Sequence, residues 1–212
     1  MLQRYVNSLM AILIAVGVGC ARNNRSRPNA ADAQTAQTRQ SGPNADSPLS
    51  PMVNAAYEGN VPEIKRLAAA GDSANGRRGD YFSPLYWAAN RGQEPAVRTL
   101  LQLGADPNAR TSVGQTALDE AARGGYLPIV KLLVEHHADV NAQDIPRVGG
   151  YTPLMYAAAH GHAAVAEFLV SRGASIGAKD SKGKTAAKIA TENGHPELAN
   201  WLSKQEAQQR ER

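Results

Sequence analysis

The sequence of 212 residues predicts an all-α solenoid of about five helix pairs, and three observations support this fold class. A short motif of Ser or Thr, then Pro or Ala, then an apolar residue recurs along the chain. The residues that close the motif are spaced by 33, 33, 36 and 33 positions, at Met52, Leu85, Leu118, Leu154 and Ala187. A glycine follows each closing residue after seven positions. A period of this length is typical of repeat proteins built from one helical unit per repeat.

The first helix of each unit is predicted between the motif and this glycine. A Ser or Thr oxygen caps free amide groups at a helix start, and Pro suits the first helical position because its missing N–H needs no partner. Paired alanines, as at Ala88-Ala89 and Ala157-Ala158, allow a neighbouring helix to approach closely. Glycine then ends the helix in the left-handed conformation. We therefore expect first helices within 50–59, 83–92, 116–125, 152–161 and 185–194.

A second helix is predicted after each of these glycines. Four of the five begin near a proline, at Pro62, Pro95, Pro128 and Pro196, and they carry apolar pairs such as Leu100-Leu101. They end at a second glycine in three units, at Gly71, Gly104 and Gly173. Asp- and Asn-containing stretches such as 105–108 and 138–141 come next, and these are turn sequences.

These motifs, in this order, resemble those of ankyrin repeats over residues 49 to 204. The resemblance implies a unit of two helices and a hairpin-like loop, and a scaffold that binds other proteins. Three features depart from the family pattern. Glu120 stands where an apolar residue is usual, His137 replaces a helix-ending glycine, and the loop from Asp144 to Gly150 has three extra residues. The His that usually follows the T-P-L leucine is replaced by Val53, Tyr86, Asp119, Met155 and Lys188.

The first nineteen residues predict a signal peptide. Arg4 precedes an uncharged apolar run at 9–19, which is shorter than the ~20 residues that a membrane-spanning helix needs. Cys20, the one cysteine of the chain, follows Gly-Val-Gly at the end of this run. That arrangement resembles the lipobox of bacterial lipoproteins, which implies cleavage before Cys20 and acylation of its thiol. A plain signal peptide, an uncleaved anchor and a buried core segment are the alternatives.

The lipobox resemblance also implies a location. Residues 20–48 would be the lipidated cysteine and a disordered linker, since the linker is rich in polar residues and has no aromatic residue. The repeat domain would occupy 49–204, followed by a charged tail at 205–212. We expect an exported protein, anchored by lipid to the bacterial cell envelope. Ala21 after the cysteine implies the outer membrane, facing the periplasm.

Composition and motifs argue against several function classes. Residues 49–212 hold 18 basic and 17 acidic side chains, so the domain lacks the charge excess of a nucleic-acid-binding protein. No catalytic constellation, zinc spacing or phosphate-binding loop is present, and we expect no enzyme activity, cofactor, metal or small-molecule substrate. His162 and His195 directly follow helix-ending glycines, which predicts structural roles. Trp87, Tyr156 and Trp201 are predicted to fill the core between repeats.

The remaining function is binding of another protein by a chain that we expect to be monomeric. The resemblance places partner-binding residues on the first helices and the loop tips. They are Tyr57, Glu58, Arg77, Arg78, Phe82, Asn90, Arg91, Arg110, Arg123, Arg147, Tyr151 and His160. Arginine predominates among them, which predicts an acidic patch on the partner. The same side chains could also be ordinary solvated charges.

Two further functions stay open. The domain could protect or stabilise an envelope enzyme or a toxin-like neighbour. It could also be a released, host-directed interactor if Cys20 is not lipidated.

Overall fold

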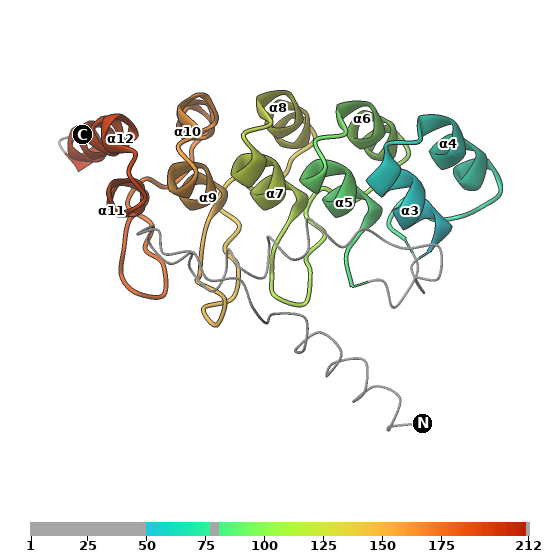
Figure 1. Cartoon of the computed structure of the whole chain (residues 1–212), viewed down its shortest axis with the longest axis horizontal. Helices are drawn as coiled ribbons and strands as arrows, with labels where there is room; N and C mark the ends of the chain where they lie inside the picture. The colour runs from blue at the N-terminus through green and yellow to red at the C-terminus, as the bar shows by residue number, and fades with distance from the viewer. Residues whose placement is uncertain (1–49, 77–80, 211–212) are drawn as a thin grey trace, which may run out of the picture.

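The computed structural model describes residues 50–76 and 81–210, and within these ranges it contains ten helices and no strand. The helices pair along the chain, and the pairs stack side by side into the predicted solenoid (Figure 1). The first helices form an inner row, with α3 (Pro51–Glu58), α5 (Pro84–Asn90), α7 (Ala117–Gly124), α9 (Pro153–Ala159) and α11 (Ala186–Glu192). The second helices form an outer row, with α4 (Val61–Ala69), α6 (Glu94–Gln102), α8 (Leu127–Glu135), α10 (Ala163–Ser171) and α12 (Pro196–Arg210).

Three segments named in the sequence analysis lie wholly or partly outside the described residues. The signal peptide at 1–19 and the segment 20–48 with Cys20 are among them, as are the last two residues of the tail. The rest of the predicted tail, up to Arg210, continues helix α12.

Side-chain caps begin three of the five inner helices, whereas the motif predicts one at each; Ser50 before α3 and Thr185 before α11 stand at the cap position without a side-chain cap bond. Ser83 accepts a hydrogen bond from the backbone amide of Tyr86, and Thr152 accepts one from Met155. Thr116 forms a full capping box, because Asp119 also accepts from the backbone amide of Thr116. Each cap satisfies an amide that the helix itself leaves without a partner.

Residues with positive φ end the helices of both rows. The five glycines after the inner helices have φ between 69° and 81°. Among the described residues, His137 alone takes this conformation without being glycine, with φ of 68° at the place where other units have Gly71, Gly104 or Gly173. The prediction that His137 replaces a terminating glycine is therefore confirmed.

Alanine and leucine side chains fill one continuous core between the two rows. The alanine pairs of the inner helices are essentially inaccessible, and so are Leu85, Leu118 and Leu154, the apolar residues that close the motif. Trp87 and Tyr156 are also buried, at 4% and 3% exposure, and Trp201 packs partly buried against the core. Their predicted packing role is confirmed.

Asparagine side chains join the loops of successive repeats. Asn108 accepts a hydrogen bond from the amide of Asp139 at 2.8 Å and donates to the carbonyl of His137 at 3.0 Å. One repeat later, Asn141 accepts a hydrogen bond from the amide of Ser175 and donates one to the carbonyl of Gly173. These bonds connect neighbouring loops in a chain that lacks the usual histidine of the T-P-L motif.

The hairpin loops close in the same way in successive units. In the regular ones the amide of Thr111 donates to the carbonyl of Gln115, and Asp180 donates to Lys184. In the longer loop the backbone amide of Asp144 donates to the backbone carbonyl of Tyr151, and these residues are seven positions apart instead of four. The three extra residues of this loop therefore lie at its tip and leave the helices in register.

Candidate binding surface

The inner helices present three positions that decide which side chains reach the surface. We number these positions from the apolar residue that closes each motif. Position 2 holds Asn54, Trp87, Glu120, Tyr156 and Ile189, and position 5 holds Tyr57, Asn90, Arg123, Ala159 and Glu192. Positions 2 and 5 are three residues apart and share one face of a helix. Position 6 holds Glu58, Arg91 and His160 among others, of which Glu58 and Arg91 are exposed and His160 is half-buried.

Along the first four repeats the residue at position 5 of one repeat contacts the residue at position 2 of the next, and we call this series the inner ladder. Tyr57 packs edge-on against Trp87, with ring centroids 5.5 Å apart. Asn90 donates a hydrogen bond to Glu120, and the guanidinium of Arg123 lies 4.3 Å above the centre of the Tyr156 ring. The inner ladder therefore buries side chains that a single repeat would leave exposed.

A buried ion pair occupies the centre of the inner ladder. Arg123 donates to Glu120 at 2.7 Å, and the side chains are 2% and 0% exposed. Tyr86 donates to the same carboxylate oxygen of Glu120 at 3.1 Å, and Asn90 donates to the other. Burial disfavours the charged guanidinium, but the fields of Glu120 and of the neighbouring Tyr156, Tyr86 and Asp119 together outweigh burial and hold the pKa of Arg123 above its usual value. Burial raises the pKa of Tyr86, so its hydroxyl stays protonated and donates to Glu120.

Two predicted binding residues belong to this interior network, and the expectation that they face a partner is wrong. Asn90 is 4% exposed and Arg123 is 3% exposed. Both stand at position 5, where the next repeat covers them. Glu120 departs visibly from the repeat pattern, but its pairing with Arg123 was not predicted, although a separation of three residues on one helix is a usable signal.

Two further carboxylates lie close to this pair. Asp119 is fully buried, and burial raises its pKa to about 7 against the opposing effect of the hydrogen bonds from Thr116. Asp144 accepts hydrogen bonds from the Tyr156 hydroxyl and the Tyr151 amide, yet its burial still raises its pKa. Three acidic groups thus surround one buried arginine.

The exposed part of the surface contains what we call the aromatic patch, formed by Tyr57, Phe82 and Arg91. Tyr57 and Phe82 are half-buried, and both rings pack on Trp87, at 5.5 and 5.4 Å. Arg91 is exposed and its guanidinium lies 4.8 Å above the Tyr57 ring. Tyr57 comes from α3, Phe82 from the loop before α5 and Arg91 from the residue that ends α5, and the contacts with Trp87 hold the two rings in place.

The other predicted residues are distributed more widely. Glu58 and Arg147 are exposed, while Arg110 is exposed and donates to the carbonyl of Gln143. Tyr151 is half-buried against Tyr156, at 5.3 Å, and His160 is half-buried and stacked on His162, at 6.2 Å. Arg77 and Arg78 lie outside the described residues. Tyr81 is 69% exposed beside Phe82 in the chain and was not among the predicted residues.

The histidines that follow helix-ending glycines have structural positions, as predicted. A side chain from each unit covers the helix-ending glycine of the unit before it. A Cβ atom at Gly125 would lie 2.6 Å from His162, and one at Gly161 would lie 2.5 Å from His195. His162 also contacts the carbonyl of Arg123 at 2.9 Å. Throughout the described residues, no three His, Cys, Asp or Glu side chains gather as a metal site would require.

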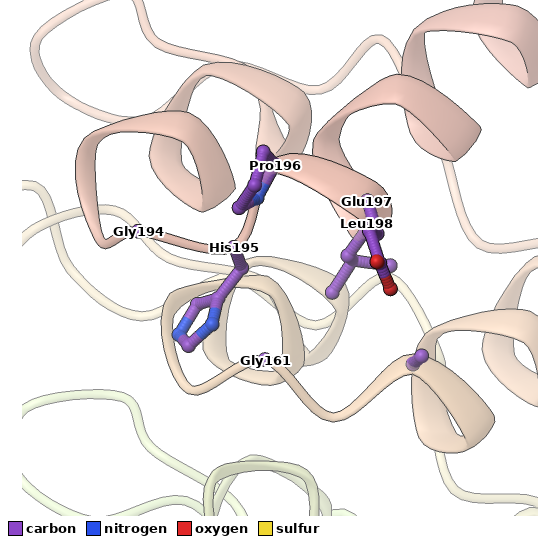
Figure 2. Close-up of a pocket in the computed structure, with 7 residues that line it drawn as sticks. Gly161, Gly194, His195, Pro196, Glu197 and Leu198 are labelled. Atoms are coloured by element: carbon purple, nitrogen blue, oxygen red, sulfur yellow. The ribbon is translucent and has the colours of Figure 1, made fainter.

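A groove of about 310 Å³ lies between the last two repeats (Figure 2). Its lining consists of Gly161, Ala163, Gly194, His195, Pro196, Glu197 and Leu198. In Figure 2 the ring of His195 extends over Gly161. This side chain therefore closes one side of the groove by covering the glycine.

Comparison with known protein families gives one match. The family model described as ankyrin repeats matches three stretches of the chain, at residues 20–111, 52–144 and 145–212. Together these stretches extend over most of the sequence. No curated protein sequence matches the chain as a relative.

Proposed function

The chain belongs to the ankyrin-repeat family, whose members are typically non-enzymatic binding scaffolds, and we propose that it binds another protein through the aromatic patch. The family membership supports a protein partner in general. The choice of surface is supported by the side chains that the inner helices leave exposed.

The aromatic patch is the observation that carries this proposal. Tyr and Arg are enriched among the residues that dominate binding energy in interfaces. Tyr57 and Phe82 are already held against Trp87, so binding would cost them little conformational entropy. Arg91 lies over Tyr57 with its charge accessible, which suits a carboxylate on the partner.

Electrostatic attraction supports an acidic partner surface. Arg91 is exposed beside the two rings of the patch, and Glu58 is the exposed acid at the end of α3. Complementary charge of this kind accelerates encounter and selects against wrong partners. Affinity should therefore weaken as salt is added.

Charge reversal at Arg91 tests the proposed surface. Arg91→Glu combined with Tyr57→Ala is expected to weaken binding of the purified partner by more than tenfold, which is about 1.4 kcal/mol. The partner would first be identified by cross-linking in intact cell envelopes, and its affinity then measured by calorimetry at low and at physiological salt.

Arg172→Glu is the matched control, because Arg172 is also exposed and stacks on an aromatic ring, Phe168, at 4.8 Å on the outer row. Its affinity should stay unchanged. Equal losses in both variants would place the binding surface elsewhere.

We further propose that lipid on Cys20 anchors the domain to the bacterial cell envelope, at the outer membrane and facing the periplasm. The sequence of residues 1–20 supports this through its apolar run and the cysteine that ends it. Within residues 50–76 and 81–210, no helix is both long and apolar enough to cross a bilayer.

Substitution of the cysteine tests the anchor. Cys20→Ser should abolish incorporation of labelled palmitate and move the protein into the soluble fraction. Palmitate labelling that persists in this variant would exclude the lipobox. Mass spectrometry of the mature amino terminus would separate an anchored protein from a released, host-directed one.

A further inference from the structure

Three hairpin tips in the carboxyl-terminal half form one continuous edge, which we call the tip edge. It consists of residues 110–115, 143–150 and 179–184. The amide of Ile145 donates to the carbonyl of Val113 at 3.1 Å, and Ser181 donates to Gly149 at 2.8 Å. In Figure 1 these loops project together on the side away from the outer row of helices. Their exposed side chains can therefore meet an extended surface at the same time.

The tip edge concentrates positive charge. Its basic residues are Arg110, Arg147, Lys179, Lys182 and Lys184. Its two acids are both buried and bonded to backbone amides. Asp144 accepts from Tyr151, and Asp180 accepts from Lys182 and Lys184, at 2.8 Å each.

The rest of the domain has the opposite balance. Residues 49–212 hold 18 basic and 17 acidic side chains, of which the tip edge contributes five and two. The remaining residues of 49–212 include 13 basic and 15 acidic side chains, which is a net negative charge. The positive excess of this range therefore comes from the tip edge. Lys184 is paired with Glu192, and the other four basic side chains are exposed.

The longest tip adds apolar surface. Ile145 is 37% exposed, and the exposed Pro146 and Arg147 follow it. Few large apolar side chains of the described residues are as accessible. A basic residue beside a projecting isoleucine and proline suits a boundary between charged groups and hydrocarbon.

We infer that the tip edge docks on an anionic phospholipid surface. Each Lys or Arg close to such a surface contributes about 1 kcal/mol, or about fivefold in affinity, so four exposed cations on one edge give useful binding. A protein partner fits this edge less well, because lysine is depleted in protein interfaces and three of the five cations are lysines. The aromatic side chains suited to a protein partner lie on the aromatic patch instead. This inference does not depend on acylation of Cys20.

A fluorescent label at the tip tests the contact directly. Full-length Cys20→Ser protein carrying Ser181→Cys has one thiol, on an exposed residue of the tip edge, and would be modified with an environment-sensitive dye. The dye should respond to vesicles of phosphatidylcholine mixed with phosphatidylglycerol, and the response should fall as salt is added. The same dye at Gln102→Cys, exposed on α6 in the outer row, should not respond. Equal responses to phosphatidylcholine vesicles alone would contradict the inference.

Charge removal gives a matched comparison. In the labelled protein, Arg147→Gln, Lys179→Gln and Lys182→Gln together should reduce the apparent affinity for the anionic vesicles by about tenfold or more. The control variant removes the same charge from exposed residues of the outer row, through Lys65→Gln, Lys131→Gln and Lys204→Gln. Its apparent affinity for the anionic vesicles should change less than about twofold. Both variants should keep the melting temperature. Equal losses in the two variants, or lost affinity for a purified protein partner without any vesicle response, would overturn the inference.

Discussion

At the scale of single residues, the ion pair of Glu120 and Arg123 determines the character of the inner ladder. Taking two charges out of water costs several kcal/mol per ion, and the pair is tolerated because hydrogen bonds complete it. Tyr86 and Asn90 from the preceding repeat supply these bonds to Glu120, while Tyr156 from the following repeat covers Arg123. Three repeats therefore share one buried pair.

Removal of the arginine alone should destabilise the domain strongly. Arg123→Met leaves Glu120 as an uncompensated buried charge, which is expected to lower the free energy of unfolding by about 3–5 kcal/mol in urea titrations. Adding Glu120→Gln to this variant should recover about half of the loss or more, because it removes the charge and keeps an acceptor for Asn90. Arg91→Met, on the surface, should stay within about 0.5 kcal/mol of the parent protein. No recovery in the double variant would argue against a charge effect.

The buried carboxylate of Asp119 should make stability depend on pH. Its pKa of about 7 in the fold exceeds the ordinary value of 3.8, so the folded state keeps a proton that the unfolded state loses between these values. The free energy of unfolding should therefore fall as pH rises from about 4 to about 7, and Asp144 adds to the same trend. Glu63 and Glu192 have lowered pKa values and act in the opposite direction, below about pH 4.5.

Asp119→Asn should flatten this pH dependence. Asparagine resembles the protonated acid and keeps an acceptor for the bonds from Thr116. Urea titrations across this pH range measure the slope in both proteins. An unchanged slope in the variant would assign the titration to another group.

The helical phase explains which site residues were predictable from the sequence. Arg91 and Arg123 both precede a helix-ending glycine by one or two residues and look equivalent in the repeat pattern. Arg91 stands at position 6 and is exposed, whereas Arg123 stands at position 5 and is buried. Tyr57 and Phe82 are half-buried and Arg91 is exposed, and their partner-binding role stays a prediction. Burial of Asn90 and Arg123 depends on what the next repeat carries at position 2, which a reading of each repeat by itself does not include.

At the scale of helices and loops, the ends of elements follow local rules. The period and the glycines predict every helix of the described solenoid, because start and stop signals lie within each unit. The extra length of the 144–150 loop was also predictable. The hydrogen bond that the Tyr156 hydroxyl donates to Asp144, the first residue of this loop, was not predictable, because it depends on the burial of the Asp144 carboxylate.

The end of helix α8 offers a way to stabilise the domain. His137 has a φ of 68°, a conformation that costs a residue with a side chain about 1 kcal/mol or more. His137→Gly should raise the free energy of unfolding by about 0.5–1 kcal/mol, after allowance for the greater freedom of glycine in the unfolded chain. His136→Gly is the control, because His136 has a φ of −94° and should gain nothing from glycine. Thermal unfolding of the two variants would show the difference, and a lower melting temperature for His137→Gly would refute this reasoning.

At the scale of the whole molecule, the repeats depend on one another in order. Deletion of one unit joins position 5 of the unit before it to position 2 of the unit after it. Deletion of 116–151 removes Glu120 and Arg123 together and brings Asn90 beside Tyr156. Deletion of 83–115 removes Tyr86 and Asn90, both donors to Glu120, and deletion of 152–184 removes the Tyr156 ring that covers Arg123.

We therefore expect the deletion of 116–151 to be the least destabilising of the three. All three proteins should keep a helical circular dichroism spectrum, since solenoids tolerate the loss of one unit when at least three remain. Their melting temperatures should rank with the 116–151 deletion highest. The reverse order would show that the buried ion pair stabilises the domain more than its neighbours do.

The inner ladder also bears on how such an array could lengthen during evolution. A tandem duplication of 116–151 would place Arg123 of the first copy beside Glu120 of the second, because position 5 meets position 2 of the following unit. Opposite charges would then alternate along the array, and the guanidinium of the first copy would find a carboxylate on either side, while that of the second copy would keep the Tyr156 ring as its neighbour. Duplication of 152–184 would instead set Ala159 against a second Tyr156 and leave its hydroxyl without the donor that Gln115 provides. Of these two units, the third is thus the one whose duplication adds a carboxylate partner for its buried arginine.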